Sequence, residues 1–463
     1  MMVASETCRN AGATRGGVFA LARSRVTAAM PVRTSELLRF RRAKPESEGV
    51  RVTSIRIELL NESHRAAVRA LASDETLSHT AAPTPARDAD IDQLLAHNAA
   101  GPRVVRTFAI LDGALVVGTV TLKRLDAGDN SAELSYWVGT EYHRKGYAFG
   151  GAQLAVAYAF DELLVDYMHA HFLKVSNVGS LRVLQKLGFT KDPNKEDMKS
   201  EGRFAARFPD DYWTFVRLNR PADIAGAAKG YARRWDAYMT QYCGGRASCF
   251  ELAEELMRQR LQGESLRVLD IGCGTGAFTA RQLGIDGPQR HVTAIDGSAT
   301  SLLIARHVIG TDPRVSFVQA DITTDDWAAK LPPGSIDAAF IGWVTHEVPP
   351  GSLPRLYGNL ARVLRPGGVL FNVDFMDALE PGFRGLADEY RRHRVTDEFK
   401  TYRARFESLP PIAAAKASEL PARTTPSIYH AAATHVRHLH QAGFVEAEAI
   451  WRYIGFSMVM AVR

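Results

Sequence analysis

The sequence contains few cysteines, and they are not arranged to bind a metal or to form a disulfide framework. Its 463 residues include four cysteines, Cys8, Cys243, Cys249 and Cys273, without a CxxC pair or a zinc-type spacing. No apolar run approaches the roughly 18 residues that a membrane-spanning helix needs. These absences predict a cytoplasmic protein with reduced thiols, no metal site and no membrane segment.

The two main parts of the chain also lack a net charge. Residues 51–220 hold 21 Lys and Arg against 21 Asp and Glu, and residues 221–463 hold 27 against 26. Most of the net charge of +6 comes from residues 1–50, with nine basic and four acidic residues. Nucleic-acid binding requires a concentrated basic surface, which neither part has. The charge balance therefore favours a small-molecule substrate over a nucleic acid. Residues 1–50 are expected to be a disordered extension, with a mitochondrial targeting segment as the alternative.

Length and local patterning divide the chain into two α/β domains joined by a linker. In the first domain, residues 51–218, turn signals separate short strands expected at 107–111, 116–123 and 132–138. Residues 219–230 are rich in small residues and are expected to form a linker poor in helix. In residues 231–463, helices alternate with buried strands beginning at 266–271, a pattern typical of a doubly wound parallel sheet.

A glycine-rich turn follows the first buried strand of the second domain. Residues 268–276 read VLDIGCGTG, a hydrophobic strand that leads into a glycine turn and then a helix. Glycine lets a ligand lie directly against the backbone. Taken alone, this turn also fits a dinucleotide-binding site. Asp296 and Asp321 end the next two strands, at the sheet edge where such folds bind ligands.

The series VLDIGCGTG, AIDGS, VQADI, IDAAFIG and VLRPGGVLF resembles the class I S-adenosylmethionine-dependent methyltransferases in order and spacing. The resemblance covers residues 231–463 and implies a Rossmann-like sheet with a substrate lid at 376–433. It implies that the methionine and ribose of S-adenosylmethionine lie against Gly272, Gly274 and Gly276. Asp296 would bind the ribose hydroxyls, and Asp321 and Ile322 would contact the adenine edge. The same resemblance places Asp270, Cys273 and Gly297 in the cofactor site.

Two sets of residues near this site are open to more than one interpretation. His346 and Glu347 follow the fourth strand and are candidate bases or substrate contacts, although either could instead cap a helix or pack a loop. Tyr231, Trp235 and Tyr238 are either a helical cap over the cofactor or part of the core.

The first domain has a different pair of motifs. Residues 131–151 contain a strand followed by a basic glycine turn, and a helix is expected to follow at 152–164. Backbone N–H groups at such a turn, together with the helix dipole, suit a pyrophosphate. Residues 177–189 read NVGSLRVLQKLGF, a helix that ends in a glycine-capped turn.

These motifs resemble the GNAT acyltransferases, particularly the branch that acetylates the N-terminal alanine of ribosomal proteins. The resemblance implies a mixed, mainly antiparallel sheet, and Glu133 as the general base that deprotonates an amine. It implies acetyl-CoA contacts at Trp137, Val138, Arg144, Lys145, Gly146, Tyr147, Ala148, Asn177 and Ser180. His143 and Leu184 differ from the residues of many relatives, which leaves open a degenerate domain that only binds.

The two domains together predict a bifunctional enzyme that methylates and acetylates a small amine-bearing metabolite. One alternative is a methyltransferase whose degenerate GNAT domain binds the substrate or a partner. Another is an enzyme that modifies protein N-termini or tRNA. The sequence does not indicate the oligomeric state.

Overall fold

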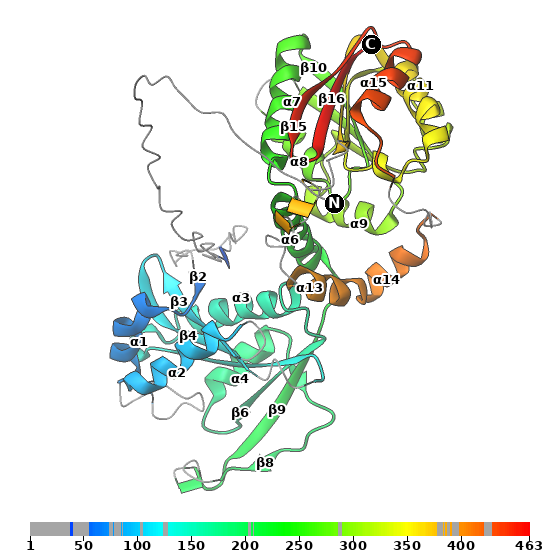
Figure 1. The fold of residues 1–463 in the computed structure, drawn as a ribbon. Helices are drawn as coiled ribbons and strands as arrows, with labels where there is room; N and C mark the ends of the chain where they lie inside the picture. The colour runs from blue at the N-terminus through cyan, green and yellow to red at the C-terminus, as the bar shows by residue number, and fades with distance from the viewer. Residues whose placement is uncertain are drawn as a thin grey trace, which may run out of the picture. The chain divides into compact units, whose positions relative to one another are not determined.

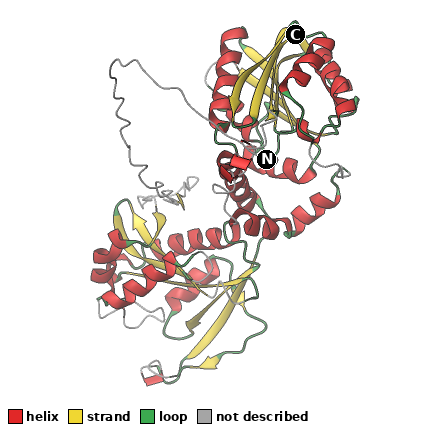
Figure 2. Cartoon of the chain, in the orientation of Figure 1, coloured by secondary structure: helices red, strands yellow, loops and turns green. Residues whose placement is uncertain are grey.

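In the described part of the chain, the strands form two sheets, each flanked by helices (Figures 1 and 2). The computed structural model describes residues 38–39, 55–73, 77, 85, 87–101, 105–123, 128–201, 205–206, 208–285, 289–376, 383, 385–386, 389–390, 398–420 and 428–463. The segment 1–50 lies outside these residues except for Leu38–Arg39, so both of its interpretations stay open. Within the described residues, no helix is long and apolar enough to cross a membrane, and no cluster of His, Cys, Asp and Glu could hold a metal ion.

Among the described residues, the first sheet has nine strands in the order β1-β2-β3-β4-β5-β6-β9-β7, with β8 paired to β9. They are β1 (Leu38–Arg39), β2 (Ile55–Leu59), β3 (Arg106–Asp112), β4 (Leu115–Lys123), β5 (Ser131–Val138), β6 (Tyr167–Leu173), β7 (Thr190–Lys191), β8 (Met198–Lys199) and β9 (Tyr212–Asn219). Every pairing is antiparallel except β5 with β6. This confirms the predicted mixed sheet, and β3, β4 and β5 match their predicted ranges to within one residue at each end.

Helices cover both faces of the first sheet. Alternate residues of β5 and β6 pack against α3 (Tyr147–Asp161) and α4 (Val178–Lys186) on one face. Trp137 of β5 packs on the opposite face against α1 (Arg65–Ala72) and α2 (Asp88–Ala99). Two-residue alternation along a strand therefore assigns each side chain of β5 to a known face.

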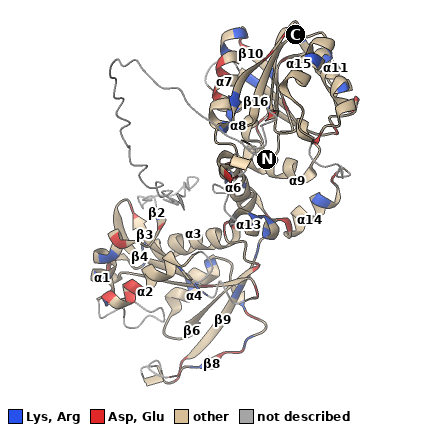
Figure 3. Cartoon of the chain, in the orientation of Figure 1, with Lys and Arg blue, Asp and Glu red and all other residues tan. Residues whose placement is uncertain are grey.

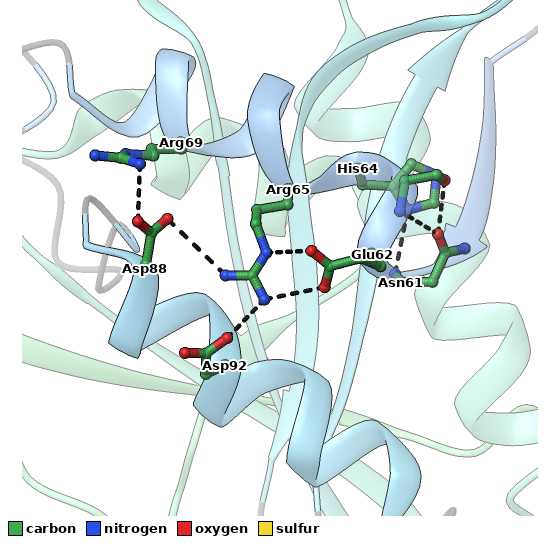
Figure 4. A network of polar contacts seen from close by, with 8 residues as sticks. Asn61, Glu62, His64, Arg65, Arg69, Asp88 and Asp92 are labelled. Carbon is green, nitrogen blue, oxygen red and sulfur yellow. Dashed lines mark hydrogen bonds and ion pairs between the residues drawn. The ribbon is translucent and has the colours of Figure 1, made fainter.

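The two helices of the second face are joined by ion pairs (Figure 4). Arg65 of α1, which follows the 3₁₀ turn η1 (Glu62–His64), donates to Glu62 at 2.5 Å and to Asp92 of α2 at 2.6 Å. Arg69 of α1 lies 2.8 Å from Asp88 of α2. Figure 3 shows basic and acidic positions along α1 and α2. Because the pairs are largely exposed, they orient the helices more than they stabilise the fold.

The second sheet has seven strands in the described part of the chain, in the order β12-β11-β10-β13-β14-β16-β15. They are β10 (Ser265–Ile271), β11 (Gln289–Asp296), β12 (Val315–Gln319), β13 (Ile336–Gly342), β14 (Leu364–Phe375), β15 (Glu446–Tyr453) and β16 (Phe456–Val462). The pairings from β12 to β14 are parallel, and β16 is antiparallel to both of its neighbours. This confirms the Rossmann-like sheet predicted from the sequence.

Helices pack on both faces of this sheet as well, because their apolar residues recur at helical spacing. In α11, for example, Leu353, Leu356, Tyr357 and Leu360 lie on one side of the helix and are fully buried. The helices and 3₁₀ turns of this half are α6 (Ala225–Tyr242), α7 (Arg246–Arg260), α8 (Ala277–Leu283), α9 (Ala299–Ile309), α10 (Asp326–Ala329), η4 (Thr345–Glu347), η5 (Pro350–Ser352), α11 (Leu353–Val363), α13 (Glu398–Glu407), α14 (Pro410–Ala417) and α15 (Ala432–Gln441).

Two local predictions are wrong. Residues 219–230 are not poor in helix, because α6 begins within them at Ala225, and its alanines favour helix and are partly buried in the core. The helix predicted at 152–164 spans Tyr147–Asp161 instead, since the preceding Gly146 has φ +88° and forms its N-cap. The predicted lid at 376–433 lies partly outside the described residues, and its described part contains α13 and α14.

Candidate active sites

The glycine-rich segment of the second half forms a sharp turn between β10 and α8. Gly272, Gly274 and Gly276 have φ values of +68°, +53° and +86°, in the left-handed region that favours glycine. A Cβ added to Gly272 would lie 1.9 Å from Cγ2 of Val344, whereas one added to Gly274 would meet no atom within 4 Å. The turn therefore presents bare backbone to open space at Gly274, as a nucleoside ligand requires.

Asp296, at the end of β11, ties this turn to the neighbouring strand. Its Oδ2 accepts a hydrogen bond from the Gly274 N–H, and its Oδ1 accepts one from the Ser298 N–H, each at 2.8 Å. Burial raises the pKa of Asp296, and the two backbone hydrogen bonds oppose the shift. Each carboxylate oxygen can accept a second hydrogen bond, so the geometry is compatible with the predicted contact to ribose hydroxyls.

Three further predicted cofactor residues lie at the same edge of the sheet. Asp296 of β11 is paired with Gln319 of the parallel strand β12, so the two strands end together. Asp321 and Ile322 follow Gln319 by two and three residues. The carbonyl of Gly297 accepts a hydrogen bond from the Gln319 side chain at 3.3 Å. The structure therefore gathers these predicted residues around the glycine turn.

Asp270 and Cys273 are buried within the fold beside the turn. The Thr279 hydroxyl of α8 donates a 2.6 Å hydrogen bond to Asp270, and burial raises the pKa of Asp270 to about 7. Cys273 packs in a small apolar cluster with Ala294 and Leu302. The hydrogen bond holds α8 against β10, and the apolar cluster joins the turn to β11 and α9. The predicted contacts of Asp270 and Cys273 with the cofactor stay predictions.

A histidine–aspartate pair lies where β13 and β14 end. His346 belongs to the turn η4 after β13, and Asp374 is the penultimate residue of β14. Nδ1 of His346 lies 3.0 Å from Oδ1 of Asp374. Oδ2 of Asp374 also accepts from the His346 backbone N–H at 2.9 Å and from the Thr345 hydroxyl at 2.8 Å. The carboxylate therefore fixes both the ring and the backbone of His346.

The two members of this pair stabilise each other's charged forms. Burial lowers the pKa of His346, but its hydrogen bond and charge interaction with Asp374 outweigh burial and raise the pKa above the ordinary value. Burial raises the pKa of Asp374, and the interactions with His346 outweigh this effect and lower it. An ionised Asp374 favours the tautomer with hydrogen on Nδ1, which leaves Nε2 of His346 available to accept a proton.

The neighbouring residue Glu347 is less well placed for catalysis. Its side chain is 75% exposed, and its Oε1 lies 3.9 Å from Nε2 of His346. Of the two predicted catalytic residues here, His346 has the better geometry. Sequence reasoning missed Asp374, whose signal is a single carboxylate in the otherwise mostly apolar strand segment VLFNVDF.

The aromatic residues of α6 pack mainly within the protein. Tyr231 is 8% exposed, and its ring centroid lies 4.5 Å from that of Phe406 in α13. The rings of Trp235 and Tyr238 lie 5.7 and 5.2 Å from that of Phe399, also in α13. These contacts favour the core interpretation over a cap on the cofactor.

In the first half of the chain, β5 and β6 run parallel and then separate. Their last pair is Glu133 with His169, although β5 continues to Val138 and β6 to Leu173. Beyond Glu133, β5 remains paired with β4 on its other side through Trp137 and Val138. The described residues therefore contain two splayed strands, with the backbone of β5 facing the gap between them.

The turn predicted to bind the pyrophosphate directly precedes helix α3 and includes its first residues. Arg144 and Gly146 have φ values of +61° and +88°, and Lys145 between them is exposed. Tyr147 and Ala148 begin the helix. A Cβ added to Gly146 would meet no atom within 4 Å, so the turn faces open space. Backbone N–H groups at such a turn and the positive end of the helix dipole both favour an anion there.

Asn177 and Ser180 lie at the start of α4. Oδ1 of Asn177 accepts a hydrogen bond from the Ser180 N–H at 3.1 Å, which makes Asn177 the N-cap of the helix. The Ser180 hydroxyl lies 2.9 Å from the hydroxyl of Tyr136 on β5. The two predicted residues are therefore next to each other, and Tyr136, which sequence reasoning missed, links them to the splayed strand.

Glu133 lies at the point where β5 and β6 separate and has three basic neighbours. Its carboxylate oxygens are 3.8 Å from Nε2 of His169, 3.9 Å from Nδ1 of His171 and 3.9 Å from Nζ of Lys123. Burial raises the pKa of Glu133, but these neighbours outweigh burial and lower it to about 2. Sequence reasoning missed both histidines, whose signal is the alternation His-Ala-His along one strand.

Both sites thus combine a glycine turn that faces open space with a histidine beside a carboxylate, an arrangement compatible with group transfer. Comparisons with known proteins agree with this division. Residues 54–190 match the family model of the acetyltransferase (GNAT) domain, and residues 268–368 match that of a methyltransferase domain. The chain therefore combines a GNAT acetyltransferase domain with a methyltransferase domain. The first implies acetyl-CoA as its cofactor, and the second implies S-adenosylmethionine.

Individual relatives match parts of the chain. The ubiquinone/menaquinone biosynthesis C-methyltransferase UbiE of Methylobacterium nodulans is 30% identical over 164 residues, which cover 35% of this chain and 63% of that protein. The malonyl-[acyl-carrier protein] O-methyltransferase of Pectobacterium atrosepticum is 35% identical over 144 residues, covering 28% of this chain and 51% of that protein. The chain thus spans less than two thirds of either relative. A solved spermidine N-acetyltransferase from Vibrio cholerae, in complex with CoA and spermine, aligns with a TM-score of 0.31 at 18% identity, covering 36% of this chain and 95% of that one.

Proposed function

We propose that the chain is a bifunctional cytoplasmic enzyme that transfers a methyl group from S-adenosylmethionine and an acetyl group from acetyl-CoA to a small amine-bearing metabolite. One observation carries the proposal: each half keeps both an open glycine turn for a donor and a histidine beside a carboxylate. Gly274 and His346 are the key residues of one half, and Gly146 and His171 those of the other. The balanced charge of both halves supports a small acceptor over a nucleic acid.

In the methyltransferase half, the donor's sulfonium supplies an activated methyl group, so the protein has to align the acceptor and remove its proton. Asp296 would hold the ribose, and the backbone at Gly274 would lie against the donor. Nε2 of His346 would take the acceptor's proton. Asp374 would hold the imidazole through Nδ1 and stabilise the imidazolium that forms.

In the acetyltransferase half, the turn at 144–148 would hold the pyrophosphate of acetyl-CoA. Of the two predicted residues, Val138 would offer its backbone N–H to the oxyanion that develops on the thioester, because the next N–H along the strand, that of Gly139, donates to the Val117 carbonyl on the β4 side and successive N–H groups point to opposite sides. The ionised Glu133 would attract a positively charged amine to the gap between β5 and β6. The amine would then be positioned next to the thioester carbonyl.

A competition assay tests the proposal. The purified full chain is incubated with both donors, a panel of small polar amines, a peptide with N-terminal alanine and a tRNA, and products are identified by mass spectrometry. Small amines carrying both groups are expected. Asp296→Ala should abolish only methylation, and Gly146→Ala should weaken only acetylation. Gly113→Ala is the matched control, because this exposed glycine also has a positive φ, +61°, and no atom lies within 4 Å of an added Cβ.

The other outcomes separate the alternatives. Methylated products without acetylation or CoA binding would support a degenerate GNAT domain that serves only in binding. Preferential modification of the peptide or the tRNA would refute the small-metabolite acceptor. Loss of both reactions in either single variant would contradict the assignment of one donor to each half.

A further inference from the structure

Sequence reasoning names Glu133 as the base of the acetyl-transfer reaction, but the arrangement around it favours another residue. We infer that His171 takes the proton from the acceptor amine and that Glu133 is its charge partner. This inference rests on the proposed acetyltransferase activity. It deepens that proposal by assigning the proton transfer to a residue that neither the motifs nor the comparisons indicate.

The position of His171 supports this role. Met168, Ala170 and Phe172 of β6 pack against the core beneath α3, so His169 and His171 lie on the opposite face of the strand. His169 is level with Glu133 in the last pair that β5 makes with β6. His171 is therefore the first residue on this face beyond the last pair, at the mouth of the gap.

His171 is also the more accessible of the two histidines. Its side chain is 35% exposed, against 8% for His169. Its ring contacts Trp213 edge-on, with centroids 5.1 Å apart, and lies 6.0 Å from the ring of Phe215. These aromatic side chains of β9 hold the imidazole in place. A substrate can thus reach His171 without displacing the core.

The gap between His171 and Glu133 fits an amine. Nδ1 of His171 lies 3.9 Å from Oε1 of Glu133, too far for a direct hydrogen bond. A nitrogen placed off the line between them can bond to both atoms at the usual distance of about 2.9 Å. Nε2 of His169 is buried without a hydrogen-bond partner and lies 3.8 Å from the same carboxylate. Nε2 of His169 is therefore a second atom of the site that a bound polar ligand could hydrogen bond.

The charges around His171 keep its imidazole neutral. Burial lowers the pKa of His171, and the charge of Glu133 on β5 opposes this. The positive charges of Lys123 on β4 and Lys195 between β7 and β8 lower it further, as does the neighbouring imidazole of His169 on β6. The net result is a pKa below the ordinary value. A neutral imidazole can accept a proton near pH 7, whereas a carboxylate with a pKa of about 2 is a poor base there.

The reaction then balances as follows. The bound ammonium gives one proton to His171, and the freed lone pair attacks the thioester carbonyl of acetyl-CoA. A C–N bond forms, the C–S bond breaks, and the second proton of the nitrogen leaves with CoA as its thiol. His171 returns its proton to solvent. Glu133 stays ionised throughout and stabilises both the incoming ammonium and the imidazolium.

Two measurements on the full chain test the inference. The first is kcat for acetylation as a function of pH, with saturating acetyl-CoA and amine. His171→Gln should lower kcat by about 100-fold or more and abolish the acid limb of the profile. His97→Gln, a change to a partly exposed histidine at the end of α2, should have no effect. Imidazole added to His171→Ala should restore part of the rate.

The second measurement is an NMR titration of the histidine side chains. The resonance assigned by its loss in His171→Gln should titrate below pH 6.5. Because the charge of Glu133 raises the pKa of His171, Glu133→Gln should move that titration to lower pH and not remove it. An unchanged pH profile in His171→Gln would overturn the inference and leave the proposed function intact. Failure of the wild type to acetylate any amine would overturn both.

Discussion

Replacing Gly274 with alanine tests directly whether the glycine turn of the second half holds a nucleoside donor. Gly274 has φ +53°, and an added Cβ would project into space with no protein atom within 4 Å. The folded protein then bears only the cost of a non-glycine residue in the left-handed region, about 1–2 kcal/mol. If the donor occupies that space, the new methyl group competes with it, and affinity should fall by at least about tenfold, equivalent to roughly 1.4 kcal/mol.

The neighbouring glycine provides the contrast. At Gly272 an added Cβ would lie 1.9 Å from Cγ2 of Val344, so Gly272→Ala introduces a steric clash in addition to a strained φ of +68°. This variant should lose stability as well as donor binding. The double variant Gly272→Ala with Val344→Ala should recover part of the stability because the clashing branch is removed. Gly274→Ala, by comparison, should fold almost normally and fail mainly in binding.

The assay is isothermal titration with S-adenosylmethionine or its product S-adenosylhomocysteine, alongside calorimetric unfolding of each variant. Gly358→Ala is a suitable control, since this exposed glycine in α11 has nothing within 4 Å of an added Cβ and its change should slightly stabilise the helix. Donor affinity equal to wild type in Gly274→Ala would refute the placement of the donor against this backbone.

Two further predictions follow from buried polar contacts. Asp374→Asn removes the charge that raises the pKa of His346. The acid limb of the pH profile of kcat for methyl transfer should therefore move to lower pH, and the plateau value of kcat should fall. An unchanged acid limb would show that His346 is not the titrating base. Asn98→Ala should destabilise the first domain by about 2–4 kcal/mol, because the Leu60 carbonyl and the Thr107 N–H each lose a 2.9 Å hydrogen bond to Asn98 in a buried position, while the Thr107 carbonyl keeps its bond from the Leu60 N–H. Urea unfolding measures this loss, and Asn194→Ala at an exposed position is its control.

Much of the fold could be predicted because periodicity and glycine turns are local signals. The strands β3, β4 and β5 follow from apolar runs bounded by turn residues, and each was placed within one residue at either end. The start of α3 was missed, since the pattern places Tyr147 and Ala148 in a turn, whereas Gly146 in the left-handed conformation already caps the helix. Residues 219–230 were predicted to be poor in helix because their small residues resemble a loop, whereas their alanines favour helix and α6 begins at Ala225.

The glycine turns were predictable for the same reason, but the residues that pair with His346 and Glu133 were not. His346 could be named because it directly follows a recognisable strand. Asp374 lies 28 residues further on, and only the pairing of β13 with β14 brings it within 3.0 Å of the imidazole. His171 likewise acquires its role from the register of β5 with β6 and from the aromatic residues of β9. Strand pairing between distant segments leaves no signal in a single sequence.

The two histidines differ in how their carboxylates approach them, and this difference has a measurable consequence. Asp374 hydrogen bonds directly to His346, so the pKa of His346 lies above the ordinary histidine value, whereas Glu133 stays 3.9 Å from His171 and burial keeps the pKa of His171 below that value. A base works only when deprotonated, so acidification should inhibit methyl transfer before acetyl transfer. With saturating substrates, the acid limb of kcat should have its midpoint below the ordinary histidine pKa for acetylation and above it for methylation. Parallel decline of the two rates in one preparation would contradict this assignment of the bases.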